Sequence, residues 1–204
     1  MLRNVFLKTL RDQRRSFIYW SAGVALLTLI TILFYPAIRE APELSEVFAE
    51  AEVLAEVFAG GFTDLTSPEG YLNSQLFSLM VPLLLAIFAI ASGSGAIAGE
   101  EERGTLDVLL SYPTTRSQVL LQKAAAMLAA TLALGLVLWA TLVIGAPLVD
   151  MDVSIFGAAQ VTFSAVLFGL LFGYMSLALG SATGRRGLSI GATSGIAIGT
   201  FLPN

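Results

Sequence analysis

Cysteine and histidine are missing from all 204 residues, and charged residues are few. Without cysteine and histidine the chain can form no disulfide bond, and it lacks a reactive thiol, the usual ligands for zinc or haem, and a Ser-His-Asp triad. Charged residues make up 13% of the chain and hydrophobic residues 56%, whereas a typical soluble domain is about 25% charged. This composition excludes an ordinary soluble enzyme. It also excludes intrinsic disorder, which requires low hydrophobicity and high charge.

The charges that are present form clusters, and the stretches between them are long enough to cross a bilayer. A hydrocarbon core of about 30 Å requires roughly 20 apolar residues in a helix. The sequence therefore predicts an all-α fold, a polytopic transmembrane helical bundle that forms a single domain over residues 1–204. We expect spans at 16–38, 70–99, 117–149, 153–184 and 187–204. Since Phe201-Leu202-Pro203 is typical of a helix exit, we expect a sixth span to be missing at the C-terminal end.

Basic residues indicate how the spans are oriented, because cytoplasmic loops carry an excess of Lys and Arg. Ten of the 11 basic residues fall on one side of the predicted bundle, in 1–15, in the connection 100–123 and at Arg185-Arg186. Arg39 is the single basic residue on the other side, where the connections are acidic. This distribution predicts a multi-pass protein of the cytoplasmic (inner) membrane with its N-terminus in the cytoplasm.

Two segments outside the spans have the apolar periodicity of surface helices. Residues 1–15 place apolar side chains at helical spacing among five basic residues, which predicts an interfacial helix on the inner leaflet; the alternative is a frayed basic tail that serves topology alone. Residues 43–59 carry an apolar stripe flanked by glutamates, and Gly60-Gly61 would end that helix. We expect an external amphipathic helix there, and we favour a solvated structural role over attraction of cationic substrates.

Glycines recur at every fourth residue of the last predicted span. The four that would share one helix face are Gly187, Gly191, Gly195 and Gly199. Small residues at this spacing allow helix backbones to approach closely. We expect this face to make a tight contact, either within the protein or between two copies in a dimer, and we expect no substrate site on it.

The connection between the second and third predicted spans is more apolar than a short loop requires. Gly104 or Thr105 can begin a short helix there, and Pro113 must end it. Its apolar face would consist of Leu106, Leu109 and Leu110. A second helix is expected to begin near Thr115, whose side chain can form a capping box with Gln118. An apolar face on a surface segment indicates a docking element.

The run from Glu101 to Lys123 resembles the signature of type-2 ATP-binding-cassette (ABC) exporter permeases. It reads Glu-Glu-Arg-Gly-Thr-Leu-Asp-Val-Leu-Leu-Ser-Tyr-Pro-Thr-Thr-Arg-Ser-Gln-Val-Leu-Leu-Gln-Lys. In that family an acidic-Arg-Gly-Thr-Leu stretch, a leucine run, a proline and an arginine follow the second span. The basic N-terminal segment, the acidic external loop and Arg185-Arg186-Gly187 are also similar to bacterial members. The resemblance covers essentially the whole chain and departs from the family at the end, where a sixth span is usual.

This resemblance implies a permease subunit that works in the lipid bilayer as a homo- or heterodimer with two separate ABC ATPase subunits. Residues 100–113 would form the coupling helix, seated in a groove of the ATPase, with 1–15 as the elbow helix beside it. Closure of the ATPases on ATP would then switch a cavity between inward and outward access. The family exports drugs, peptides, lipids and glycans, so the resemblance does not identify the substrate.

Within the expected coupling helix, polar contacts to the ATPase are expected from Glu101, Arg103 and Asp107. Leu106 and Leu109 are the expected apolar contacts. Alternatively, the acidic run is solvated and the leucines lie on the inner leaflet. The complete set of expected coupling residues is Glu100, Glu101, Arg103, Gly104, Thr105, Leu106, Asp107, Leu109, Leu110 and Pro113.

The sequence contains no source of energy for transport. It lacks Gly-x-x-x-x-Gly-Lys-Ser/Thr, the loop that binds ATP phosphates, and no ionisable residue lies in mid-span to mark a proton path. We therefore expect no catalytic residue, metal or cofactor in this chain, ATP and Mg²⁺ on the partner subunit, and no nucleic-acid partner. The main alternative is a non-transporting membrane anchor or assembly protein, because few polar residues are available to line a substrate pocket. A proton-coupled transporter and an intramembrane enzyme fit the sequence less well.

Overall fold

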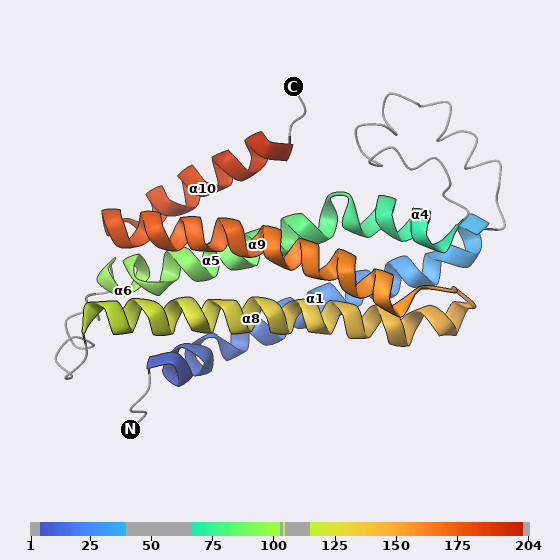
Figure 1. Cartoon of the computed structure of the whole chain (residues 1–204), viewed down its shortest axis with the longest axis horizontal. Coiled ribbons are helices and arrows are strands. Elements are labelled where there is room, and N and C mark those ends of the chain that lie inside the picture. The colour runs from blue at the N-terminus through green and yellow to red at the C-terminus, as the bar shows by residue number, and fades with distance from the viewer. Residues whose placement is uncertain (1–4, 40–66, 103, 105–114, 202–204) are drawn as a thin grey trace. The chain divides into compact units, whose positions relative to one another are not determined.

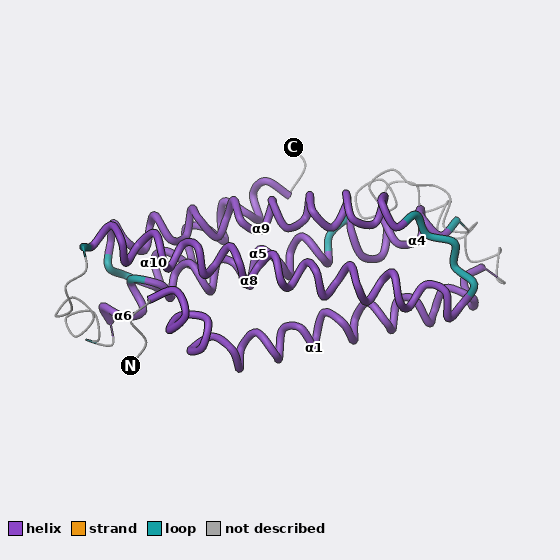
Figure 2. The backbone as a smooth tube through the Cα atoms, turned by 60° about the horizontal axis from the view of Figure 1, so that its bottom comes forward, coloured by secondary structure: helices purple, strands orange, loops and turns teal. Residues whose placement is uncertain are grey.

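The computed structural model describes residues 5–39, 67–102, 104 and 115–201. Every regular element in these ranges is a helix, as Figure 2 shows, and the predicted all-α fold is confirmed. In chain order the elements are α1 (Val5–Arg39), α4 (Pro68–Leu72), the π-helix η1 (Asn73–Phe77), α5 (Met80–Ala96), α6 (Ala98–Glu102), α8 (Arg116–Gly145), the 3₁₀-helix η2 (Ala146–Val149), α9 (Ile155–Thr183) and α10 (Arg186–Phe201). The predicted external helix at 43–59 lies outside the described residues.

Four helical stretches are long and apolar enough to cross a membrane. They are Val5–Arg39, Pro68–Ala96, Arg116–Val149 and Ile155–Thr183, and they correspond to the first four predicted spans. The 16-residue helix α10 covers most of the fifth. The chain is therefore a multi-pass helical membrane protein.

Helix α1 runs without interruption through the point where the sequence predicts a boundary between an interfacial helix and a span. Residues 5–39 form one helix of 35 residues, so the N-terminal segment is helical from Val5, and its division into an interfacial part and a span stays a prediction. The reason is local. No glycine or proline occurs between Val5 and Ala22, so no residue there removes a backbone hydrogen bond or adds backbone freedom.

The second span begins as expected but contains an irregularity that the sequence did not reveal. Ser67 caps its N-terminus by accepting a hydrogen bond from the Gly70 N–H at 3.2 Å, and Pro68 occupies the first turn. The helix then widens into η1, where the Ser78 N–H donates to the Asn73 carbonyl at 2.7 Å. This five-residue spacing of the bond is that of a π-helix.

The chain folds into two compact units. The first comprises Met1–Tyr19, Leu85–Leu134 and Val166–Asn204, and the second comprises Trp20–Leu84 and Gly135–Ala165. In the second unit, the Tyr71 hydroxyl donates to the Thr31 carbonyl at 2.9 Å, and the rings of Tyr35 and Tyr71 lie 5.4 Å apart between centroids.

Close backbone packing between α5 and α9 forms the centre of the first unit. A β-carbon at Gly173 would lie 2.8 Å from that of Ala89, and one at Gly93 would overlap the Gly173 carbonyl oxygen. At Gly169 the nearest atoms are those of Leu85, at 3.0 Å. Glycine is required at these positions because any side chain would force the helices apart.

Helix α10 packs on the same unit through its hydroxyl-bearing face. The inward side chains are Ser189, Thr193 and Ala197, all buried. The Ser189 and Ser176 hydroxyls lie 2.9 Å apart, and the Ser176 hydroxyl donates to the Ile90 carbonyl at 3.1 Å. These bonds link α10 to α9 and α9 to α5.

The glycine stripe of α10 faces the other way. Gly187, Gly191, Gly195 and Gly199 are exposed, and a β-carbon at any of them would meet nothing within 4 Å. Within the part of the chain that the structure describes, this stripe therefore makes no close contact, because serine, threonine and alanine fill the inner face of α10. The expected contact with a second copy stays a prediction.

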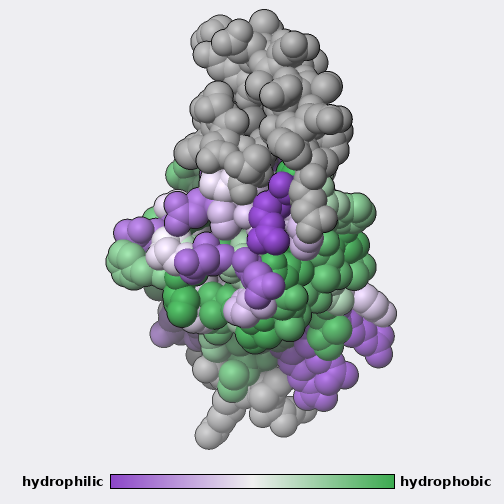
Figure 3. All heavy atoms as spheres, turned by 90° about the vertical axis from the view of Figure 1, so that its right-hand side faces the viewer, coloured by the Kyte–Doolittle hydropathy of each residue, from purple (hydrophilic) through white to green (hydrophobic). Residues whose placement is uncertain are grey.

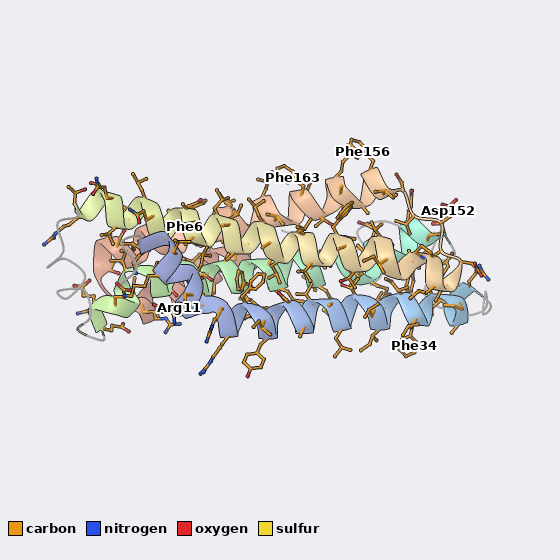
Figure 4. The ribbon with its side chains drawn as sticks, turned by 90° about the horizontal axis from the view of Figure 1, so that it is seen from below. Phe6, Arg11, Phe34, Asp152, Phe156 and Phe163 are labelled. Atoms are coloured by element: carbon orange, nitrogen blue, oxygen red, sulfur yellow. The ribbon has the colours of Figure 1, made fainter. Side chains whose placement is uncertain are left out.

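Large apolar side chains cover the outside of the helices. Phe34, Phe156 and Phe163 project away from the helices in Figure 4, with exposed fractions of 62%, 72% and 54%. Apolar surface is extensive in Figure 3 as well, and the hydrophilic residues gather in separate groups. Such a surface is suited to lipid chains, which solvate it as well as protein does.

Replacing Gly173 with leucine should lower the stability of the folded chain, because the side chain would collide with Ala89 and Met127. Overpacking of this kind costs about 1–3 kcal/mol or more. Thermal unfolding in mild detergent should show a lower midpoint for Gly173→Leu than for the matched substitution Gly191→Leu, which enters open space. Equal midpoints for the two variants would contradict the packing described for α5 and α9.

Candidate functional site

Three glutamates at the end of α6 lie where α6, the start of α8 and the turn between α9 and α10 come together, at the left of Figure 1. We call Glu100, Glu101 and Glu102 the glutamate triplet. They stand at the beginning of the segment 100–113, which the sequence predicts to be the coupling helix. Each of the three carboxylates lies against a different part of the first unit.

Glu100 forms an ion pair with Lys123 of α8. Its Oε1 lies 2.7 Å from the Lys123 Nζ, and the two side chains are only 12% and 3% exposed. The Lys123 ammonium also donates to the Ala96 carbonyl near the end of α5. A buried lysine is tolerated only when it is paired and hydrogen-bonded, and here it joins α8 to both α5 and α6.

Glu102 binds the first turn of α10. Its Oε1 accepts a hydrogen bond from the Arg186 N–H at 2.8 Å. The first N–H groups of a helix have no partner within the helix and carry the positive end of its dipole, so a carboxylate is well placed there. This bond connects α6 to α10 across 84 positions of sequence.

Glu101 lies against the turn that separates α9 from α10. Gly184 ends α9 with a positive φ of 64°, and a β-carbon at this position would come 2.7 Å from the Glu101 Oε2. Both the left-handed backbone and the close carboxylate therefore favour glycine. Gly104 has a φ of 67° and donates its N–H to the Glu101 carbonyl at 3.0 Å, which ends the helical course of α6.

The predicted capping box forms at the start of α8, where the connection between the second and third spans ends. The Thr115 N–H donates to the Gln118 Oε1 at 3.2 Å, and the Gln118 N–H donates to the Thr115 Oγ1 at 3.3 Å. This reciprocal pair confirms the expected start of the third span.

The first turns of α8 also contact the start of α1. The Gln122 Oε1 accepts a hydrogen bond from the Phe6 N–H at 3.1 Å, so α1 begins beside α8 (Figure 4).

The structure places only part of the expected coupling set. Glu100, Glu101 and Gly104 are described, and the two glutamates lie against other parts of the chain. The other expected residues, Arg103, Thr105, Leu106, Asp107, Leu109, Leu110 and Pro113, lie outside the described residues.

Sequence reasoning missed three participants: Glu102, Lys123 and the N-terminus of α10. A signal for Lys123 was present, because it falls on the helical stripe Val119, Lys123, Ala126, Met127 and Ala130, whose other members are all apolar and buried. A charge on an apolar stripe indicates a buried ion pair near a helix end. No comparable pattern in the sequence indicates that Glu102 would reach Arg186.

The fold defines a helical membrane protein, with four helical stretches among the described residues that are long and apolar enough to cross a membrane. Residues 3–203 match the family described as ABC-2 family transporter protein, and the chain belongs to that family. It is also 30% identical over 147 residues to the Pseudomonas aeruginosa protein named "Probable ABC transporter permease protein NosY", covering 67% of this chain and 49% of that protein. The chain thus spans about half the length of this relative. No solved structure matches the chain.

Truncating Glu100 should destabilise the protein, because it leaves the buried Lys123 ammonium without its carboxylate. Removing one partner of a buried pair costs about 3–5 kcal/mol. Thermal unfolding should therefore place Glu100→Ala well below the native chain. The double variant Glu100→Leu with Lys123→Met should lie closer to the native midpoint, since replacing both charges with apolar groups is often neutral. A midpoint for the double variant as low as that of Glu100→Ala would count against the pairing.

Proposed function

We propose that this chain is the transmembrane permease subunit of an ABC exporter, which moves its substrate across the cytoplasmic membrane by alternating access. The observation that carries the proposal is membership of the ABC-2 transporter family over nearly the whole chain. Four long apolar helices supply the membrane domain. The name of the Pseudomonas aeruginosa relative is consistent with the same role.

A separate ATPase subunit supplies the energy in this proposal. The sequence has no phosphate-binding loop of the Gly-x-x-x-x-Gly-Lys-Ser/Thr type, so ATP and Mg²⁺ are assigned to the partner, and the permease itself carries out no catalysis. Residues 100–113 form the contact with the ATPase. Support comes from the apolar composition of this segment and from the ordered helix ends on either side of it.

The orientation follows from the distribution of charge. Arg11, Arg14, Arg15, Arg116 and the pair Arg185-Arg186 belong to the basic side, which we assign to the cytoplasm. The N-terminus and the glutamate triplet then lie on the side where an ATPase can bind. A second permease subunit completes the transporter, and the exposed glycine face of α10 is available for close contact with it.

Purification of the tagged chain from its native membrane tests the proposal directly. We expect an ABC ATPase to co-purify in about equal amount, and we expect the complex to hydrolyse ATP in a vanadate-sensitive manner. A chain that is purified intact from native membranes without any ATPase would contradict the exporter and favour a non-transporting membrane anchor or assembly protein.

The coupling segment can be tested in the same complex. Arg103→Ala combined with Leu106→Asp should uncouple ATP hydrolysis from export, because it removes a polar and an apolar contact expected at the ATPase surface. Export is followed in inverted membrane vesicles with the substrate that the native complex transports, beside the rate of ATP hydrolysis. Asp152→Asn, which changes a carboxylate on the opposite side, is the control. Unchanged coupling in the double variant would refute the assignment of the segment.

A further inference from the structure

Two carboxylates of the glutamate triplet, those of Glu100 and Glu102, bond to neighbouring helices, although the triplet stands at the start of the segment expected to contact the ATPase. Glu100 is bound to Lys123 and is only 12% exposed on its side chain. Glu102 is bound to the Arg186 N–H. The largely buried Glu100 carboxylate is poorly available as a contact for another subunit, whereas Glu102 is exposed but already bonded to α10. Their positions suit a different role, in which they attach the N-terminal end of the coupling segment to neighbouring helices.

One set of bonds joins the start of the coupling segment to α8. The Glu100–Lys123 pair joins the last turn of α6 to the second turn of α8, and Lys123 also reaches the Ala96 carbonyl of α5. A charge-assisted bond of this kind has a fixed direction and a short length. An apolar contact at the same place would preserve stability but would let the two helices slide.

A second set of bonds joins the start of the coupling segment to α10, and α10 in turn bonds to α9 of the first unit. Glu102 holds the first N–H of α10. One turn further on, Ser189 bonds to Ser176 of α9, and Ser176 bonds to the Ile90 carbonyl of α5. The bonds therefore form a continuous series from α6 through α10 and α9 back to α5.

We propose that Glu100, Lys123 and Glu102 are positioning residues that transmit displacement of the coupling segment to α8 and α10. The inference rests on the proposed function, since it needs an ATPase to move the segment. It goes beyond that function by assigning these charges to transmission within the permease. Glu100 is then not itself an ATPase contact, which narrows the contact proposed for residues 100–113 to the other residues of that segment.

The link to α10 can be tested on the permease alone, by hydrogen–deuterium exchange in nanodiscs. Glu102→Ala should raise the exchange rate at the start of α10 about tenfold or more, the effect expected from losing a hydrogen bond to a charged group. Glu102→Gln keeps an oxygen acceptor and should raise it much less. Equal exchange in Glu102→Ala and the native chain would overturn the link.

The transmission itself is tested in the complex with the co-purified ATPase. The native chain has no cysteine, so Leu188→Cys, at an exposed site near the start of α10, gives a single position for maleimide labelling. We expect its labelling rate to differ between the nucleotide-free complex and the complex trapped with ATP and vanadate. Absence of that difference in an otherwise native, ATP-hydrolysing complex would overturn the proposal.

Two matched pairs of substitutions then separate transmission from stability. Glu100→Leu with Lys123→Met should fold, bind the ATPase and hydrolyse ATP, but the nucleotide-dependent difference in labelling should be lost. The exchanged pair Glu100→Lys with Lys123→Glu restores a charge-assisted bond and should keep the difference. If the apolar pair keeps it too, the ion pair is merely structural and the proposal falls. If no ATPase binds the native chain, the proposed function fails, whereas the exchange experiment still decides the link to α10.

Discussion

The absence of water from the bilayer core governs how this protein is built. Backbone groups must bond within each segment, which leaves helices as the form of every span. Lipid chains are as apolar as leucine, so burying a leucine between helices gains little, and association depends on close packing and on hydrogen bonds. The structure meets this condition in the first unit at Gly93, Gly169 and Gly173, where backbones approach, and at Ser176 and Ser189, whose hydroxyls join helices.

The same condition explains why the glycine stripe of α10 faces away from the described residues of the first unit. A Gly-x-x-x-Gly spacing shows which residues share a face, but it does not show whether that face turns inward. In α10 the face with Ser189 and Thr193 is buried, and the glycine face at Gly191 and Gly195 is exposed. Ser189, which bonds to Ser176 of α9, lies on the buried face, so the hydrogen bond to a neighbouring helix rather than the glycine spacing marks the inward side of α10.

Much of the architecture could be predicted from the sequence because charge and apolar length are properties of single segments. The spans, the capping box at Thr115 and Gln118 and the end of α9 at Gly184 follow from local patterns. The junction at the glutamate triplet could not be predicted in the same way. Its bonds join residues far apart in sequence, such as Glu102 and Arg186, and their partners are determined only when the helices pack. In the sequence, this junction was indicated by Lys123, a lysine on the apolar stripe of α8.

The π-helix in the second span changes which residues face the same direction. A π-turn holds one more residue than an α-turn, and one residue corresponds to a rotation of about 100° around an α-helix. Positions before Asn73 and after Phe77 are therefore out of phase with a continuous α-helical count through the span. Tyr71, which contacts Thr31, and Leu85, which packs on Gly169, consequently belong to faces that a helical wheel drawn across the whole span would assign wrongly. The single inserted residue lets one span present two independently directed surfaces, one on each side of the widened turn.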